Sequence, residues 1–309
     1  IVGFRARLQR PHFGLTLQGG GVATIYLTLF AAARLIEGFP LIGAFVVMIL
    51  VCALGCALAL LQRSQALAAT SFLGGFAVPL LLSTGSGDVI TLFVYYTLLN
   101  VAILVIAQRR SWRVINIIGF LATFGILTLL VAVGLGPLQI FPAQVYLGTS
   151  VLIYVATSVL YGRNTPRQVG GQFDNVVDTT LLFGTALVGF GLAVSLVGDV
   201  RFGSAFVALA FAALYIAVAA LVARQEPKTG RIMTEAMLAI GVVFVTLAIP
   251  LALGARWTSA AWALEGAGAF WIGMRQARWL PRLFGLALQI VAAFVYLASF
   301  GPNVGSMPL

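Results

Sequence analysis

The sequence predicts an all-α fold, a polytopic bundle of transmembrane helices. Of its 309 residues, 61% are hydrophobic and only 8% are charged, whereas an ordinary soluble domain carries about 25% charged residues. The apolar residues form runs of about twenty, the length that crosses a bilayer as a helix, and the runs lack the alternation of transmembrane strands. The composition therefore excludes a soluble globular domain, a disordered chain and a disulfide-stapled secreted module.

Eleven segments are long and apolar enough to span a membrane, and turn-forming or charged residues separate them. The first five lie near residues 15–36, 39–61, 66–82, 88–107 and 112–133, and they are divided by Glu37-Gly38, Gln62–Ser64, Ser83–Asp88 and Arg109–Ser111. The next six lie near residues 143–162, 177–198, 202–223, 232–253, 257–275 and 280–300, after breaks at Gly134–Pro142, Arg163–Asn175, Gly198-Asp199, Arg224–Gly230, Gly254–Arg256 and Arg275–Pro281. We expect residues 1–309 to form a single transmembrane domain with these spans.

The basic residues predict the orientation of the bundle. Of the 18 Lys and Arg residues, only Arg34, Arg201 and Arg256 fall at span ends on one side, and all the others fall on the opposite side. Because short loops rich in Lys and Arg stay in the cytoplasm, we predict a bacterial inner (plasma) membrane protein with residue 1 cytoplasmic and residue 309 external. We interpret the net charge of +10 as loop bias and contact with anionic headgroups. The expected partners are therefore membrane lipids and other membrane-protein subunits, and not nucleic acid.

Four stretches of the sequence carry a resemblance to a known family: Phe13–Phe30, Leu73–Asp88, Tyr95–Asn100 and Ala255–Gly266. Together they resemble the bacterial family of predicted membrane proteins known as domain of unknown function 2339. The resemblance implies a helical membrane architecture and carries over no catalytic residue, since the family's activity is unknown. Members of the family are usually longer and this chain begins Ile1-Val2-Gly3, so we expect it to be part of a longer protein.

A weak internal repeat relates the two ends of the chain. The stretch Arg10–Gln18 parallels Pro281–Gln289, and each is followed by a Tyr-Leu pair. Either two apolar helices are similar by chance, or the last span opens a second copy of a ten-span unit in the same orientation. Parallel repeats of the second kind occur in transporters.

Glu265 is the outstanding polar residue of the sequence. It lies near the middle of the predicted span 257–275, roughly 12–15 Å from either end at about 1.5 Å per residue, where an ionised side chain costs at least about 2.5–3.5 kcal/mol. We therefore expect Glu265 to be protonated, hydrogen-bonded to polar neighbours or exposed to a watery cavity. It is either a carboxyl that couples proton or substrate movement, or a neutral group that joins helices by hydrogen bonds.

Three amide side chains are weaker candidates for the same intramembrane polar site: Asn100, Gln18 and Gln289. Interhelical amides commonly hold helices together, so each is either a structural group or a ligand contact. Gln18 precedes Gly19–Gly21, which we interpret as a close helix approach rather than a local break. Pro79 and Pro250 are expected to kink their spans.

The motif inventory mostly excludes catalysis. The sequence has no HExxH motif, no Walker loop and a single histidine, His12, so we predict no metal, no cofactor and no catalytic residue. The leading hypothesis is translocation of a small or lipid-linked substrate through a midplane cavity lined by Glu265. The alternatives are a non-catalytic scaffold that packs against other membrane proteins, and an intramembrane enzyme whose chemistry lies on another part of the protein.

Overall fold

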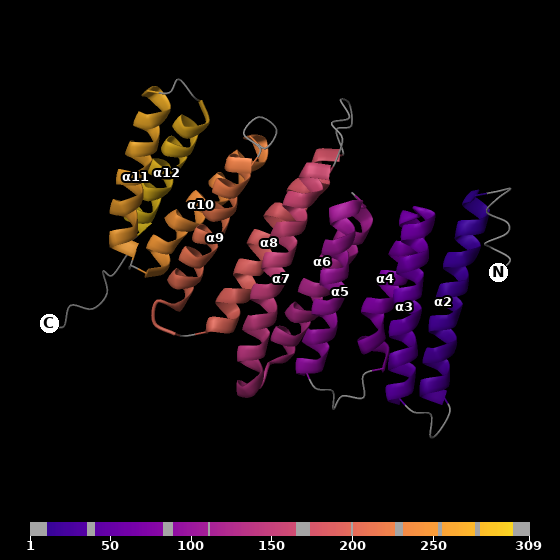
Figure 1. The fold of residues 1–309 in the computed structure, drawn as a ribbon. Coiled ribbons are helices and arrows are strands. Elements are labelled where there is room, and N and C mark those ends of the chain that lie inside the picture. Colours follow the sequence, from indigo (N-terminus) through magenta and orange to yellow (C-terminus); the bar gives the residue numbers. More distant parts are fainter. Residues whose placement is uncertain are drawn as a thin grey trace. The chain divides into compact units, whose positions relative to one another are not determined.

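The computed structural model describes residues 11–35, 41–82, 89–110, 112–164, 174–198, 200–225, 231–252, 255–275 and 279–298. Within these ranges the chain forms eleven α-helices and no strand (Figure 1). In chain order the helices are α2 (Pro11–Leu35), α3 (Leu41–Gln62), α4 (Gln65–Leu82), α5 (Val89–Arg109), α6 (Arg113–Val133), α7 (Pro137–Asn164), α8 (Asp174–Val197), α9 (Gly203–Gln225), α10 (Arg231–Ala252), α11 (Ala255–Arg275) and α12 (Trp279–Ala298).

The predicted all-α fold class is confirmed, and a helix coincides with each predicted segment. Five of the described helices are long and apolar enough to cross a membrane: Val89–Arg109, Arg113–Val133, Pro137–Gly162, Gly203–Gln225 and Met233–Ala252. Shorter apolar stretches lie within α2, α3, α4, α8 and α12. The chain is therefore a helical protein with membrane-spanning segments, and the number of eleven spans stays a prediction.

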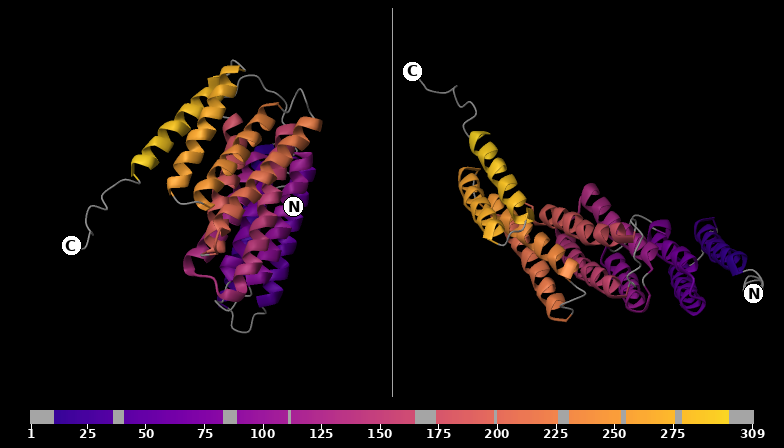
Figure 2. Two further views of the ribbon diagram at one scale, coloured as in Figure 1. Left: turned by 90° about the vertical axis from the view of Figure 1, so that its left-hand side faces the viewer. Right: turned by 90° about the horizontal axis from the view of Figure 1, so that it is seen from above.

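The helices gather in two compact units, Ile1–Leu196 and Val197–Leu309, and the expectation of a single domain stays a prediction. In the first unit α2, α3 and α4 pack on one another, α4 also packs on α5 and α6, and α7 packs on α5 and α6 (Figure 2). A hydrogen bond links α8 to α7, because the side-chain amide of Gln144 donates to the carbonyl oxygen of Leu196 at 3.2 Å.

The first unit is apolar both inside and outside. One buried cluster of α2, α3 and α4 consists of Tyr26, Met48, Cys52 and Val78. On the outer side of the unit, Leu61 and Leu121 expose 80% and 63% of their surface. Soluble monomers seldom expose contiguous apolar surface of this kind, so the outer side chains are those expected where helices meet lipid.

Three prolines lie inside the described helices beyond their first turn: Pro142 close to the start of α7, and Pro79 and Pro250 further along α4 and α10. The last two each leave a backbone carbonyl without its usual partner. Pro79 in α4 and Pro250 in α10 have no N–H to donate to the carbonyl four residues earlier, which belongs to Gly75 and Thr246 respectively. In both places an aromatic side chain of another helix supplies the missing donor. These side chains restore hydrogen bonds that a membrane interior would otherwise leave unmade.

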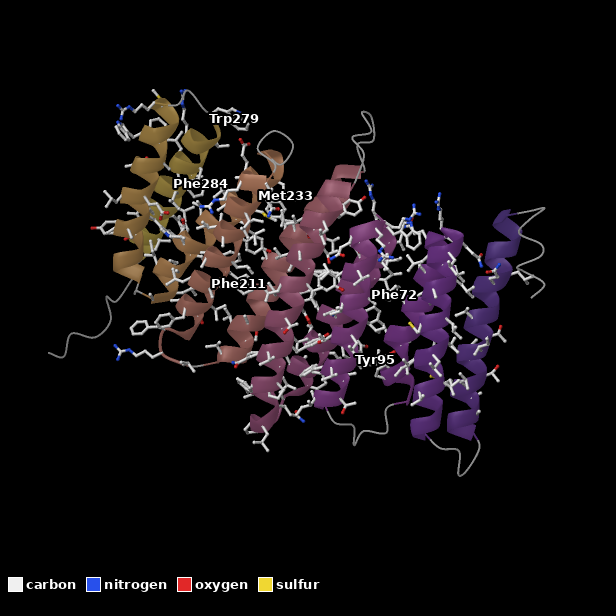
Figure 3. All side chains as sticks on the ribbon, in the orientation of Figure 1. Phe72, Tyr95, Phe211, Met233, Trp279 and Phe284 are labelled. Atoms are coloured by element: carbon white, nitrogen blue, oxygen red, sulfur yellow. The ribbon has the colours of Figure 1, made fainter. Side chains whose placement is uncertain are left out.

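The two aromatic donors come from the helix that follows each proline helix. Tyr95 of α5 donates its hydroxyl to the Gly75 carbonyl oxygen at 2.7 Å (Figure 3). Trp262 of α11 donates its indole Nε1–H to the Thr246 carbonyl oxygen at 3.2 Å. The prolines therefore link successive helices as well as interrupting their own.

The second unit consists of two helix pairs, α9 with α10 and α11 with α12, and α10 also packs on α11. Phe211 of α9 packs against Phe244 of α10 with ring centroids 5.3 Å apart (Figure 3). Gly266 of α11 faces Gly285 of α12, since a Cβ on Gly266 would lie 2.8 Å from the Gly285 carbonyl oxygen, and the reverse distance is 2.6 Å. A side chain at either glycine would push the two backbones apart.

Candidate functional site

Glu265 lies in the middle of its helix, as the sequence predicted. It is ten residues from either end of α11 (Ala255–Arg275), which corresponds to about 15 Å along the axis at about 1.5 Å per residue. The residue is half-buried. The carboxyl therefore stands as far from the helix ends as this helix allows, and its surroundings decide what it can do.

One oxygen of the Glu265 carboxyl is held by a hydroxyl of α10. Thr246 Oγ1 donates to Glu265 Oε1 at 2.7 Å and lies 3.0 Å from the carbonyl oxygen of Val242. Because a hydroxyl has a single proton, this proton is shared between the carboxyl and the backbone carbonyl. Of the three states expected for Glu265, the structure shows a hydrogen bond to a polar neighbour.

Thr246 joins α10 to α11 through two different groups. Its hydroxyl contacts Glu265, and its carbonyl oxygen, left free by Pro250, accepts the indole N–H of Trp262 at 3.2 Å. Trp262 and Glu265 are three residues apart on α11 and so share a helix face. Thr246 therefore both orients the Glu265 carboxyl and carries the carbonyl that lacks a helical donor because of Pro250.

The second oxygen of the carboxyl has no hydrogen-bond partner among the described residues. Glu265 Oε2 is a buried atom without a donor. The basic side chains described on α11 and α12 are engaged elsewhere: Arg275 lies over the Trp271 ring, and Arg282 donates to the Gly273 carbonyl oxygen at 3.0 Å. A buried acceptor left unpaired costs about 1–3 kcal/mol, so a proton or a donor group at Oε2 would stabilise the site.

Gln289 lies beside this site, whereas the other two amides have partners elsewhere. A Cβ on Gly266, the neighbour of Glu265, would lie 2.9 Å from Gln289 Cγ, which places Gln289 against the α11 backbone at this level. In the first unit, Asn100 is fully buried and its Oδ1 accepts hydroxyl protons from Thr123 and Tyr154. The structure therefore places Gln289 against the backbone of Gly266, the residue after Glu265, and places Asn100 in a hydrogen-bond network of its own.

Gln18 forms an amide pair with a residue that sequence reasoning did not single out. Its Oε1 accepts from Gln62 Nε2 at 2.8 Å, and Gln62 is the last residue of α3. Gln18 therefore lies level with a helix end. α2 continues through Gly19–Gly21 without a break, and a Cβ on Gly19 would lie 3.5 Å from Thr70 Oγ1. That distance is an ordinary van der Waals contact, and a Cβ on Gly20 or Gly21 would meet nothing within 4 Å, so the close approach suggested by the sequence stays a prediction.

Thr246 and Trp262 are the site residues that sequence reasoning missed. Threonine is common in transmembrane helices and usually bonds its own backbone, so its presence alone signals nothing. The usable signal was positional, because Thr246 stands four residues before Pro250, and the carbonyl at that position needs a donor from outside its helix.

These features define the class: a helical integral membrane protein with buried polar groups between its helices. The apolar helices place it in a membrane. The model of the family domain of unknown function 2339, described as a predicted membrane protein, matches residues 1–301, and the chain belongs to this family. The resemblance seen in the sequence is thereby confirmed. No curated protein and no solved structure matches the chain.

Proposed function

We propose that the protein translocates a small or lipid-linked substrate across the inner membrane, with Glu265 as the group that contacts the substrate or a coupled proton. Residue 1 is cytoplasmic and residue 309 external in this proposal. The observation that carries it is the asymmetry of the Glu265 carboxyl. One oxygen is fixed by Thr246 at 2.7 Å and the other is buried without a partner. Ionisable groups inside membranes characteristically mark substrate and ion pathways.

The different surroundings of the two carboxyl oxygens suit a group that couples proton binding to transport. The bond from Thr246 fixes the orientation of the carboxyl, while Oε2 remains able to accept a proton, an ammonium group or a hydroxyl donor. The neighbouring polar side chain, Gln289, adds an amide beside the α11 backbone. Among the described residues no cluster of three or more His, Cys, Asp or Glu side chains is present, and the coupling ion in this proposal is a proton.

Translocation requires that water reach position 265 from both sides of the membrane. We would introduce Glu265→Cys into a full-length Cys52→Ala/Cys56→Ala background in proteoliposomes, and apply a membrane-impermeant thiol reagent to either face. The matched control is Leu264→Cys, because Leu264 is the preceding residue and is 78% exposed on the apolar surface of the described residues. Thiols react as thiolates, which form in water and not in lipid.

The two outcomes separate the leading function from its alternative. Translocation predicts labelling of Glu265→Cys from both faces and of Leu264→Cys from neither. Absence of labelling of Glu265→Cys from both faces refutes translocation through this site and leaves the scaffold role. A companion variant, Glu265→Gln, keeps the shape of the side chain. It is expected to abolish substrate or proton flux while the protein stays folded, whereas a purely structural Glu265 predicts altered stability with no change in flux.

A further inference from the structure

A column of buried polar side chains lies between α5, α6 and α7 in the first unit. All of its members expose at most 2% of their surface, and they are Asn100, Asn116, Thr123, Tyr154, Thr157 and Ser158. Hydrogen bonds connect the three helices at the middle of the column, where Thr123 and Tyr154 both reach Asn100. An apolar bundle held by packing alone would not need this concentration of polar groups.

The side-chain oxygen of Asn100 accepts two hydrogen bonds, whereas its side-chain nitrogen has none. Thr123 Oγ1 and Tyr154 Oη each donate to Asn100 Oδ1 at 2.9 Å. Two hydroxyl protons on one oxygen fix the orientation of the amide, so that Nδ2 points away from both. Nδ2 is buried and has no hydrogen-bond partner, although its two N–H groups are strong donors.

A second unpaired amide lies along the same column. Asn116 Nδ2 is also buried without a partner, and Asn116, Gly119 and Thr123 share a face of α6 because they follow one another at intervals of three and four residues. The missing side chain of Gly119 makes room for the Tyr154 hydroxyl, which would lie 2.5 Å from a Cβ there. Asn116 therefore lies on the α6 face that also carries Thr123, the residue that donates to Asn100.

The column begins at a basic end. Arg113, the first residue of α6, donates its Nε–H to the hydroxyl of Tyr161, close to the end of α7. The sequences of α5, α6 and α7 contain no Asp or Glu. The two unpaired amides of the column offer N–H donors, Ser150 Oγ of α7 is a further buried hydroxyl without a partner, and the charge at the Arg113 end is positive.

We propose that α5, α6 and α7 enclose a water-filled path that leads from the Arg113 end to the amide of Asn100 and admits hydrogen-bond acceptors rather than cations. Water oxygen satisfies the unpaired N–H groups of Asn100 and Asn116, as buried waters do in other proteins. A small anion or a carbonyl group satisfies them by the same chemistry. A cation finds neither a carboxylate nor a free amide oxygen at Asn100, because Oδ1 is occupied. The proposal does not depend on the role of Glu265.

Radiolytic footprinting of the full-length protein in micelles tests for water directly. X-rays generate hydroxyl radicals from water in place, so a buried tyrosine beside bound water is oxidised and one in a dry environment is not. We expect Tyr154 to be oxidised several times faster than Tyr96, which is similarly buried but donates to the Phe76 carbonyl oxygen at 2.8 Å. Equal rates for Tyr154 and Tyr96 would overturn the proposal.

The second experiment tests the preference for acceptors, using Asn116→Cys in the Cys52→Ala/Cys56→Ala background. An anionic sulfonatoethyl and a cationic trimethylammonioethyl methanethiosulfonate are compared, with each rate divided by the rate of the same reagent on free 2-mercaptoethanol. The proposal predicts a larger normalised rate for the anionic reagent. Faster modification by the cationic reagent, or no modification by either, contradicts it. Ser158→Cys, on α7, repeats the measurement if the first variant fails to fold.

Discussion

The hydroxyl of Tyr95 donates to a carbonyl that Pro79 leaves free, and removing this hydroxyl gives a quantitative prediction. Tyr95→Phe deletes one oxygen atom and leaves the ring in place. The Gly75 carbonyl oxygen, now bonded at 2.7 Å, then loses the donor that replaces the absent N–H of Pro79. We expect the variant to fold and to be less stable.

The size of the effect follows from the burial of both partners. Tyr95 is 5% exposed and Gly75 is buried, so no water replaces the lost bond. Leaving a buried acceptor unpaired costs about 1–3 kcal/mol, while hydrogen bonds measured between transmembrane helices average about 0.6 kcal/mol and reach about 1.7 kcal/mol. We therefore expect Tyr95→Phe to lower the free energy of unfolding by about 1–1.7 kcal/mol.

The Pro79→Ala background isolates the cause. Alanine restores a backbone N–H that can donate to Gly75 within α4, so the carbonyl no longer depends on Tyr95. In this background we expect Tyr95→Phe to cost less than about 0.5 kcal/mol, a coupling of about 1 kcal/mol in a double-mutant cycle. Tyr96→Phe serves as the control, because its acceptor, Phe76, stands four residues before Leu80, whose N–H is present in both backgrounds.

The assay is reversible unfolding of the full chain in mixed micelles with increasing sodium dodecyl sulfate, followed by circular dichroism. All four members of the cycle are measured at one detergent ratio, and Tyr96→Phe is measured in both backgrounds. If Tyr95→Phe lowers the free energy of unfolding equally with and without Pro79, the argument is refuted. The hydroxyl of Tyr95 would then not be compensating for the missing N–H of Pro79. A larger change for Tyr96→Phe than for Tyr95→Phe refutes it as well.

Two further predictions concern glycines at close contacts, each with a control glycine on the same helix. Gly266→Ala places a Cβ 2.8 Å from the Gly285 carbonyl oxygen, so we expect a loss of about 1–3 kcal/mol, against no loss for Gly268→Ala, whose Cβ meets nothing within 4 Å. Gly119→Ala is expected to destabilise α6 packing by a similar amount, whereas Gly125→Ala meets open space. The same detergent titration checks both pairs, and equal effects within a pair would contradict the geometry.

The helices could be predicted from the sequence because the physical signal is local. Runs of about twenty apolar residues bounded by charged or turn-forming residues are visible without any knowledge of packing, and the position of Glu265 within its run follows by counting. The hydrogen-bond partners could not be predicted in this way. Thr246 meets Glu265 and Tyr154 meets Asn100 only because particular helix faces pack together, and hydropathy is nearly uniform around such helices.

The interior prolines give one route from sequence to partners, and they connect the fold to the candidate site. The carbonyl four positions before an interior proline lacks its donor within the helix, and at the two buried positions of this kind, Gly75 and Thr246, another helix supplies one. The two cases differ in one respect, because glycine offers only its carbonyl while threonine also has a hydroxyl. The Thr246 hydroxyl donates to Glu265. Trp262, which donates to the Thr246 carbonyl in place of Pro250, therefore also helps to fix the residue that orients the carboxyl. Movement of α10 at its proline would therefore change the bond to Glu265, which is the kind of coupling that a carboxyl in a transport cycle requires.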